Sequence, residues 1–208
     1  VLPGIVQFED FDIGGQGISY FDTTGGNSYG SYRTDVDVDI LAISDGGAGY
    51  GVYMTTGEWM EYTCSAQAGL YDLRVRYTTN YAVQSMQLLD GGTGQVLASF
   101  PLARTGGWSA WQDAVIEGVY LRGGENRVLR FYLADSLVSL NYVEFIRRYN
   151  LADLNRSGQV DLEDFSILSG QWLGEPNEVS ADIAPSGGDG WVDLADLAEL
   201  ADNWLIFQ

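Results

Sequence analysis

The amino-acid sequence predicts an all-β sandwich over residues 1–148, followed by a small α-helical domain over residues 149–208. Up to about residue 145, short runs of β-branched and aromatic residues alternate with clusters of glycine, asparagine, aspartate and serine. After about Tyr149, hydrophobic residues instead recur at spacings of three and four. Acidic residues also become dense there, so we place the domain boundary near residues 148–150.

The sandwich prediction rests on strands with a period of two. In residues 70–77, tyrosine, leucine and valine side chains alternate with mainly charged ones, as in a half-buried strand. Similar strand-forming runs occur at 51–54, 127–133 and 138–145. Because no convincing long helix separates these runs, we expect two packed sheets.

Two helices are predicted in the C-terminal domain, at residues 161–172 and 193–204. Hydrophobic residues in the first of them are spaced three and four apart, which places them on one helical face. We expect Trp172 and Trp204 to form the core of the helix pair. The connector at 147–151 is short and bulky, which favours packing of this domain against its own β-domain.

The composition removes several classes of catalyst. The chain has no histidine and all ten basic residues are arginine, so serine–histidine and cysteine–histidine nucleophiles cannot form. A carboxylate pair such as Glu58 and Glu61 is an alternative for glycoside hydrolysis, but both lie in a strand segment and we rank it last. The single Cys64 cannot form an internal disulfide. We therefore expect no enzyme.

Charge and hydropathy exclude two further partners. The 29 acidic and 10 basic residues give a net charge of -19, which repels nucleic acid. More than half of this charge lies beyond residue 148, where Arg156 is the only basic residue. No apolar run is long enough to span a membrane. The chain starts at Val1 without a signal-like segment, and we interpret it as part of a larger protein.

Residues 153–164 have the pattern of a calcium-binding loop. Side-chain oxygens occupy loop positions 1, 3, 5, 9 and 12, and glycine at position 6 permits the sharp turn that six to eight oxygen ligands require. A polar turn that caps a helix would explain Asp161 but not the regular spacing before it. The predicted ligand positions are Asp153, Asn155, Ser157, Gln159, Asp161 and Asp164.

A second copy of this loop and its helix follows between residues 181 and 205. Counted back from Asp196, position 1 falls on Pro185, which cannot ligate through its side chain. Asp182 takes that place if residues 184–188 form an enlarged bend. A duplicated unit of calcium loop and single helix resembles a dockerin. The second set of predicted ligand positions is Asp182, Asp189, Trp191, Asp193 and Asp196.

The dockerin resemblance implies a cohesin-like partner. It would place the contact residues at Leu162 and Glu163 in the first copy and at Leu194 and Ala195 in the second. These are not the small hydroxyl pairs of cellulosomal dockerins. Cohesin binding and packing against the chain's own β-domain therefore both stay open.

Residues 4–146 resemble a family 6 carbohydrate-binding module, which is a β-sandwich of the jelly-roll type. The loop at 22–39 is most similar to those of modules attached to agarases and related glycanases. The segments that support the resemblance are VQFEDFD (6–12), GGQGISY (14–20), YRTD (32–35), VDI (38–40), GEWMEY (57–62), TGGWSAW (105–111) and LNYVEF (140–145).

This resemblance implies a sugar site in loops at one end of the sandwich. The family's aromatic pair falls on Tyr53 and Trp108, and its polar contacts fall on Ser139 and Gln16. A sugar ring has an apolar face that aromatic rings cover and hydroxyls that need hydrogen bonds. Core packing is the alternative for both aromatic residues. Trp59 and Trp111 are assigned to the core.

The resemblance also implies a structural calcium ion held by Gln7, Glu9 and Asn141 with backbone carbonyls. The acidic residues at 35, 37 and 39 are either another metal site or a solvated strand edge. With the two loops of the C-terminal domain, this implies three calcium ions in total. Calcium dependence favours a secreted, extracellular location.

The function implied is a non-catalytic module that targets an attached glycoside hydrolase to a polysaccharide. A marine galactan such as agarose or porphyran, or a β-glucan, is the expected ligand class. The alternative is an assembly protein whose dockerin-like domain binds a cohesin and whose sandwich is mainly structural.

Overall fold

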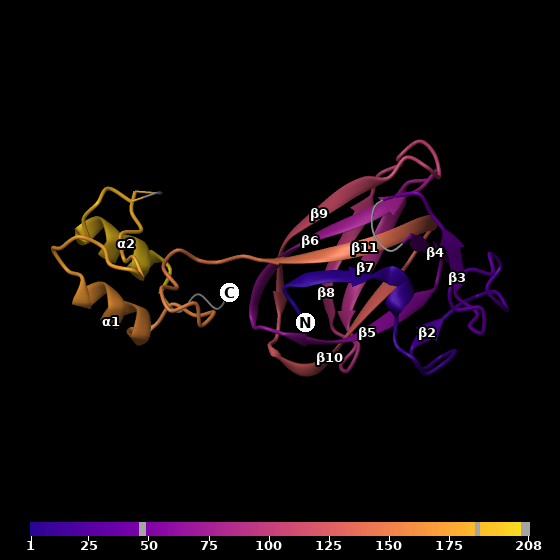
Figure 1. Ribbon diagram of the computed structural model, residues 1–208, viewed down its shortest axis with the longest axis horizontal. Helices are drawn as coiled ribbons and strands as arrows, with labels where there is room; N and C mark the ends of the chain where they lie inside the picture. The colour runs from indigo at the N-terminus through magenta and orange to yellow at the C-terminus, as the bar shows by residue number, and fades with distance from the viewer. Residues whose placement is uncertain (46–48, 186–187, 205–208) are drawn as a thin grey trace. The chain divides into compact units, whose positions relative to one another are not determined.

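The computed structural model describes residues 1–45, 49–185 and 188–204. The chain divides into two compact units, one formed by residues 1–67 and 71–147 and the other by residues 68–70 and 148–208. The first unit contains the labelled strands, apart from the first two residues of β6 (Gly69–Thr78), and the second contains both labelled helices (Figure 1). In the described parts of the chain, no helix is long and apolar enough to cross a membrane.

The first unit is a sandwich of two sheets, which confirms the predicted all-β fold. One sheet has the order β3-β4-β11-β6-β9, with β1 paired to β11, and the other has the order β2-β5-β10-β7-β8. Successive strands cross repeatedly between the sheets, as in a jelly roll. The elements are β1 (Gly4–Gln7), the short 3-10 helix η1 (Phe8–Asp10), β2 (Tyr20–Phe21), β3 (Asp39–Ala42), β4 (Tyr50–Thr55), β5 (Trp59–Ala66), β6 (Gly69–Thr78), β7 (Val83–Asp90), β8 (Val96–Leu102), β9 (Gln112–Leu121), β10 (Gly124–Leu133) and β11 (Leu137–Arg147).

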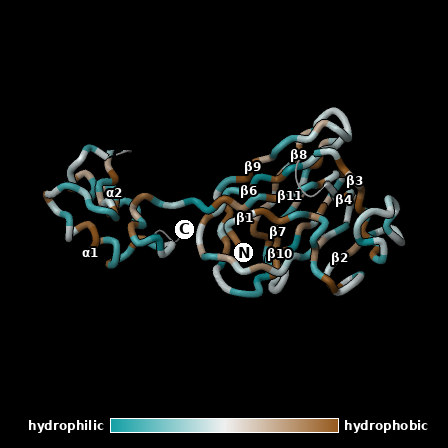
Figure 2. The backbone as a smooth tube through the Cα atoms, in the orientation of Figure 1, coloured by the Kyte–Doolittle hydropathy of each residue, from teal (hydrophilic) through white to brown (hydrophobic). Residues whose placement is uncertain are grey.

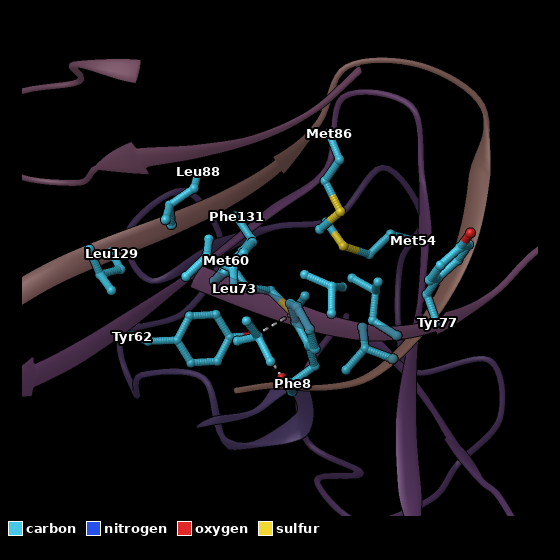
Figure 3. Packing of buried hydrophobic residues seen from close by; sticks show 14 of the residues in the cluster. Phe8, Met54, Met60, Tyr62, Leu73, Tyr77, Met86, Leu88, Leu129 and Phe131 are labelled. Carbon is cyan, nitrogen blue, oxygen red and sulfur yellow. Dashed lines mark hydrogen bonds between the residues drawn. The ribbon is translucent and has the colours of Figure 1, made fainter. Parts of the chain in front are cut away.

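A single hydrophobic core fills the space between the sheets. Phe8, Tyr62 and Phe131 meet edge to face in it, and the Tyr62 hydroxyl donates to the Phe8 carbonyl oxygen at 2.8 Å (Figure 3). In β6, the residues at 71, 73, 75 and 77 are buried and alternate with partly exposed ones, which confirms the predicted period of two. Figure 2 shows hydrophobic residues recurring within the strands of the sandwich.

Two tryptophans that we assigned to the core are in fact partly exposed. Trp59 starts β5 and its ring lies under the guanidinium group of Arg130, 3.9 Å from the ring centroid. Trp111 lies just before β9 and is also only partly buried. The sequence pattern did not predict this exposure, because a tryptophan at a strand end is amphipathic and can lie on the outer face of a sheet as well as in the core.

The second unit contains α1 (Leu162–Gly170) and α2 (Leu194–Asp202), near the two predicted helices. Each begins with the same capping box: an aspartate caps the first turn, and a second aspartate three residues later accepts from the backbone of the cap. The unit has its own core. Trp204 packs against that core, but Trp172 is exposed, so its assignment to the core was wrong. The core residues are Ala152, Leu154, Val160, Leu168, Ala181, Ile183, Val192 and Leu200.

Candidate functional site

Three neighbouring strands bring polar and aromatic side chains together on one face of a sheet. Tyr53 of β4 lies opposite Ser139 of β11, and Ser139 lies opposite Thr78 of β6. Residues directly opposite each other point to the same face. The Thr78 hydroxyl donates to the Gly107 carbonyl oxygen at 2.5 Å, which ties the loop between β8 and β9 to this face.

That loop places Trp108 beside Tyr53. The two ring centroids are 5.5 Å apart and the ring planes meet at 60°. Trp108 is 40% exposed, so the core-packing alternative is wrong for this residue. A sugar held between two rings needs roughly 7–8 Å, two van der Waals contacts of about 3.5–4 Å each. In the described arrangement, a sugar would therefore have to move Trp108 outwards or stack on its exposed face.

Gln16, the other predicted polar contact of the sugar site, is exposed and hydrogen-bonded within the protein. Its side-chain nitrogen donates to the Asp22 carbonyl oxygen at 2.6 Å, and its side-chain oxygen accepts from the Asp22 backbone nitrogen at 2.9 Å. The amide thus pairs with Asp22 as a neighbouring strand would. We conclude that Gln16 holds the start of the loop at 22–38 in place.

Glu58 links the start of the same loop to the end of β4. Its buried carboxylate accepts from the backbone nitrogens and hydroxyl groups of both Thr23 and Thr55, over 2.6–3.1 Å. Glu61, its partner in the glycosidase alternative, instead forms an ion pair with Arg130. The structure gives both carboxylates structural partners. The only sequence signal for this role of Glu58 is a threonine on each of two separate segments. That signal is too weak to predict the hydrogen bonds.

The acidic residues at 35–39 also act on this loop. Asp37 accepts from the Gly26 backbone nitrogen at 2.9 Å, and Asp39 accepts from the Ser28 backbone nitrogen at 2.7 Å. Asp39 lies opposite Tyr53 in the pairing of β3 with β4. These contacts explain two of the three acidic residues as loop anchors.

Asp22 to asparagine is expected to stabilise the sandwich at neutral pH by about 1–3 kcal/mol. Desolvation raises the pKa of Asp22 from 3.8 to about 6, hydrogen bonds from Thr24 partly oppose this, and the charges of Glu58 and Asp39 add to it. Because the folded pKa exceeds the unfolded one, ionisation destabilises the folded state progressively as pH rises from about 4 to about 6. Asparagine keeps an acceptor for Thr24 without the charge.

Urea unfolding of the wild type and Asp22→Asn at pH 4 and pH 7 tests this expectation. The variant should gain stability at pH 7 and little at pH 4. An equal change at both pH values would show that charge is not the cause.

Gln7 ends β1 opposite Tyr142 of β11, next to Asn141, and Glu9 lies in η1, which packs on β11. Glu9 is buried, and neither its two carboxylate oxygens nor the Gln7 side-chain oxygen has a hydrogen-bond partner. Desolvation raises the pKa of Glu9 to about 7. The Asn141 side-chain nitrogen donates to Asp45 at 2.9 Å. Buried oxygens without hydrogen-bond donors destabilise a fold unless a cation or a proton compensates them. These side-chain oxygens therefore fit a cation that prefers oxygen ligands.

The two loops of the second unit use their first aspartate in the same way. Asp153 accepts from the backbone nitrogens of Ser157 and Gly158, each at 2.8 Å. Asp182 accepts from those of Asp189 and Gly190, at 3.0 and 2.8 Å. Asp182 therefore takes the place of Asp153, three residues before the strict count to Pro185.

The last aspartates of the two loops also correspond. Asp164 is fully buried and accepts from the backbone nitrogens of Asn155 and Asp161. Asp196 is fully buried and accepts from those of residues 183, 184 and 193. The caps of the two helices, Asp161 and Asp193, complete the match.

The backbone conformation locates the extra residues of the second loop. Arg156 and Gly188 have φ of 58° and 75°, and Gly158 and Gly190 have φ of 96° and 95°. The loops are thus in register from Gly188 onwards, and the insertion precedes it. Of the predicted bend at 184–188, residues 186 and 187 lie outside the described residues, as does residue 205 of the second copy.

The loops differ in the oxygen groups that they offer. Ala184 follows Asp182 as Asn155 follows Asp153, so the second loop lacks a side-chain oxygen at that position. At position 7, Gln159 and Trp191 correspond and each offers a backbone carbonyl. Among the described residues, no three carboxylate, imidazole or thiol side chains are grouped to hold a metal ion. Any cation here would depend on amide, hydroxyl and carbonyl oxygens as well.

A β-sandwich with exposed aromatic side chains on loops beside its strand ends has the architecture of a ligand-binding module. The family model for carbohydrate binding module (family 6) matches residues 28–147, which is more than half of the chain. The chain therefore belongs to family 6 of the carbohydrate-binding modules, which are non-catalytic and typically occur in secreted carbohydrate-active proteins.

Solved structures with the same fold are similar at low sequence identity. A family 6 module from Clostridium stercorarium in complex with cellobiose aligns with a TM-score of 0.52 and 16% identity, covering 69% of this chain and 93% of that one. The C-terminal family 6 module of a marine laminarinase from Zobellia galactanivorans gives 0.52 and 17%, covering 69% and 98%. A module of Cellvibrio mixtus lichenase 5A in complex with cellotriose gives 0.52 and 18%, covering 72% and 100%. A search of curated proteins finds no match.

Proposed function

We propose that the sandwich binds a polysaccharide at the face formed by Tyr53, Trp108 and Ser139. The exposed Trp108 ring beside Tyr53 is the observation that supports this most directly. Aromatic rings cover the apolar face of a sugar. Ser139, which is buried and lies opposite Tyr53, is the polar residue that the family resemblance assigns to the same site. The ligands of the similar modules, cellobiose and cellotriose, favour a β-glucan. A marine galactan such as agarose or porphyran is the second ligand class.

Affinity electrophoresis tests this function. We expect retardation of the protein in gels that contain laminarin, lichenan, agarose, porphyran or xylan, with micromolar to millimolar affinity, about -8 to -4 kcal/mol. The protein has a net charge of -19, and calcium binding would make this charge less negative and so alter its mobility. Each gel is therefore compared with a sugar-free gel at the same calcium concentration. Unchanged mobility in all of the glycans would contradict the proposal.

We further propose that the protein binds calcium at three places. The matched hydrogen bonds of Asp153 and Asp182 support one ion in each loop of the second unit, with Asp182 as the first ligand of the second loop. The buried oxygens of Gln7 and Glu9, together with Asn141 nearby, support a structural ion in the sandwich. Calcium would there replace the hydrogen bonds that these oxygens lack.

The biological role that fits these sites is targeting. We propose that the module holds an attached glycoside hydrolase on its polysaccharide in a secreted protein. Family membership supports this role.

Docking by the second unit is the alternative function. Leu162 and Leu194 occupy equivalent positions at the starts of α1 and α2, and both are largely exposed, although they are apolar. Such a pair suits a protein partner of the cohesin type. Pull-down of a panel of cohesins with and without a calcium chelator tests this alternative. Capture that is lost with the chelator would support docking, and no capture in either condition would favour packing within the chain.

A further inference from the structure

A second aromatic residue lies beside Tyr53, on the loop at 22–38. The ring centroid of Tyr29 is 6.1 Å from that of Tyr53, and the ring planes meet at 66°. Tyr29 is 50% exposed, a larger fraction than for Trp108. Tyr53 therefore contacts an exposed aromatic ring from each of two different loops.

The backbone around Tyr29 is held by hydrogen bonds. The side-chain oxygen of Asn27 accepts from the backbone nitrogens of Tyr29, Gly30 and Ile40 at 3.0–3.2 Å. The same side chain donates to the carbonyl oxygens of residues 31 and 33. Asp39 holds the residue before Tyr29. A ring presented from an ordered loop loses little conformational freedom when it binds a ligand.

Other tyrosines of the region do not share this arrangement. Tyr32 comes from the same loop and is also 50% exposed, but its ring stacks on Tyr50 at 5.0 Å and its hydroxyl donates to Asp10 at 2.7 Å. The hydroxyl group of Tyr32 and one face of its ring are thus already in contact with other residues of the protein. Tyr29 is thus the tyrosine of this loop whose ring contacts Tyr53, the partner of Trp108.

We propose that Tyr29 is a further sugar-binding residue, which stacks on the sugar unit next to the one held at Tyr53 and Trp108. This inference rests on the proposed function. It makes the ligand an oligosaccharide of several units, and it gives the loop at 22–38 a role in recognising chain length. An aromatic contact of this kind changes affinity by roughly fivefold to tenfold.

Titration calorimetry with cello- and laminari-oligosaccharides of one to four sugar units, and with galactose and neoagaro-oligosaccharides of two and four units, tests the proposal. For the series that the wild type binds, Tyr29→Ala should weaken binding of the three- and four-unit sugars by about fivefold to tenfold and that of the single sugar by less than about twofold. Tyr29→Phe, which keeps the ring, should bind almost as the wild type does. Tyr32→Ala is the matched control for general disturbance of the loop.

Three results would overturn the inference. The first is unchanged binding of long sugars by Tyr29→Ala, and the second is an equal loss for all lengths. The third is an equal loss in Tyr32→Ala, which would point to loop order and not to stacking. If the wild type binds no oligosaccharide, the proposed function itself fails. If the wild type binds but Tyr29→Ala gives one of the three results above, only the inference about Tyr29 fails.

Discussion

Replacing Trp108 with alanine is expected to weaken polysaccharide binding by about 30-fold or more, since central aromatic contacts commonly contribute at least about 2 kcal/mol. Trp108 is the most exposed member of the pair with Tyr53, and it extends from a loop instead of from a sheet. Its removal should therefore eliminate a stacking surface without creating a cavity in the core. Titration calorimetry and affinity electrophoresis on the glycan that the wild type binds measure the loss.

Tyr120 provides the matched control. It is an aromatic residue of β9 with 42% exposure, close to the 40% of Trp108, and it lines a separate cavity of about 190 Å³ together with Arg122 and Arg127. Tyr120→Ala should keep wild-type affinity, and both variants should keep the wild-type unfolding temperature. Wild-type affinity in Trp108→Ala would show that the polysaccharide binds elsewhere.

Replacing Asp164 with alanine is expected to remove one calcium ion and to destabilise the second unit by about 2–4 kcal/mol. Its buried carboxylate accepts from two backbone nitrogens, one in the loop and one at the start of α1, so its loss leaves buried donors unpaired. The same residue is the last ligand position of the loop. Because an ion bound only by the folded unit adds to its stability, the effects should reinforce each other.

Calcium titration and thermal unfolding with and without a chelator measure both effects. The number of ions bound should fall by one in Asp164→Ala, and the chelator should lower the unfolding temperature of the wild type more than that of the variant. Glu175→Ala, which removes an exposed carboxylate outside both loops, controls for the change in net charge. No uptake of calcium by the wild-type second unit would contradict the assignment of these loops.

Local patterns predicted the architecture because they report contacts between near neighbours. The alternation in residues 70–77 follows from the geometry of a strand, and both helices start at a residue type that caps a first turn. The two glycines at position 6 of the loops have the positive φ that the pattern requires. The predicted calcium ions and sugar contacts remain predictions.

Contacts between distant segments escaped the same patterns. Tyr29 and Tyr53 are 24 positions apart, and nothing in the residues between them predicts that their rings meet. Glu58 was considered as a catalytic carboxylate, and only its hydrogen bonds to Thr23 and Thr55 identify it as a loop anchor. The pairing of the Gln16 amide with Asp22 was likewise not foreseen from the sequence.

Local sequence patterns predict a β-sandwich and a duplicated loop and helix unit, because periodic burial and helix capping act over a few residues. The folded chain was needed to show that Asp182, and not Pro185, is the first residue of the second loop and that Trp108 and Tyr29 both contact Tyr53. Those arrangements depend on how loops close across the ends of the sheets and around an insertion. The sandwich loop is held by hydrogen bonds between segments far apart in the chain, such as that from Thr23 to Glu58, and the insertion changes the spacing that a local pattern uses.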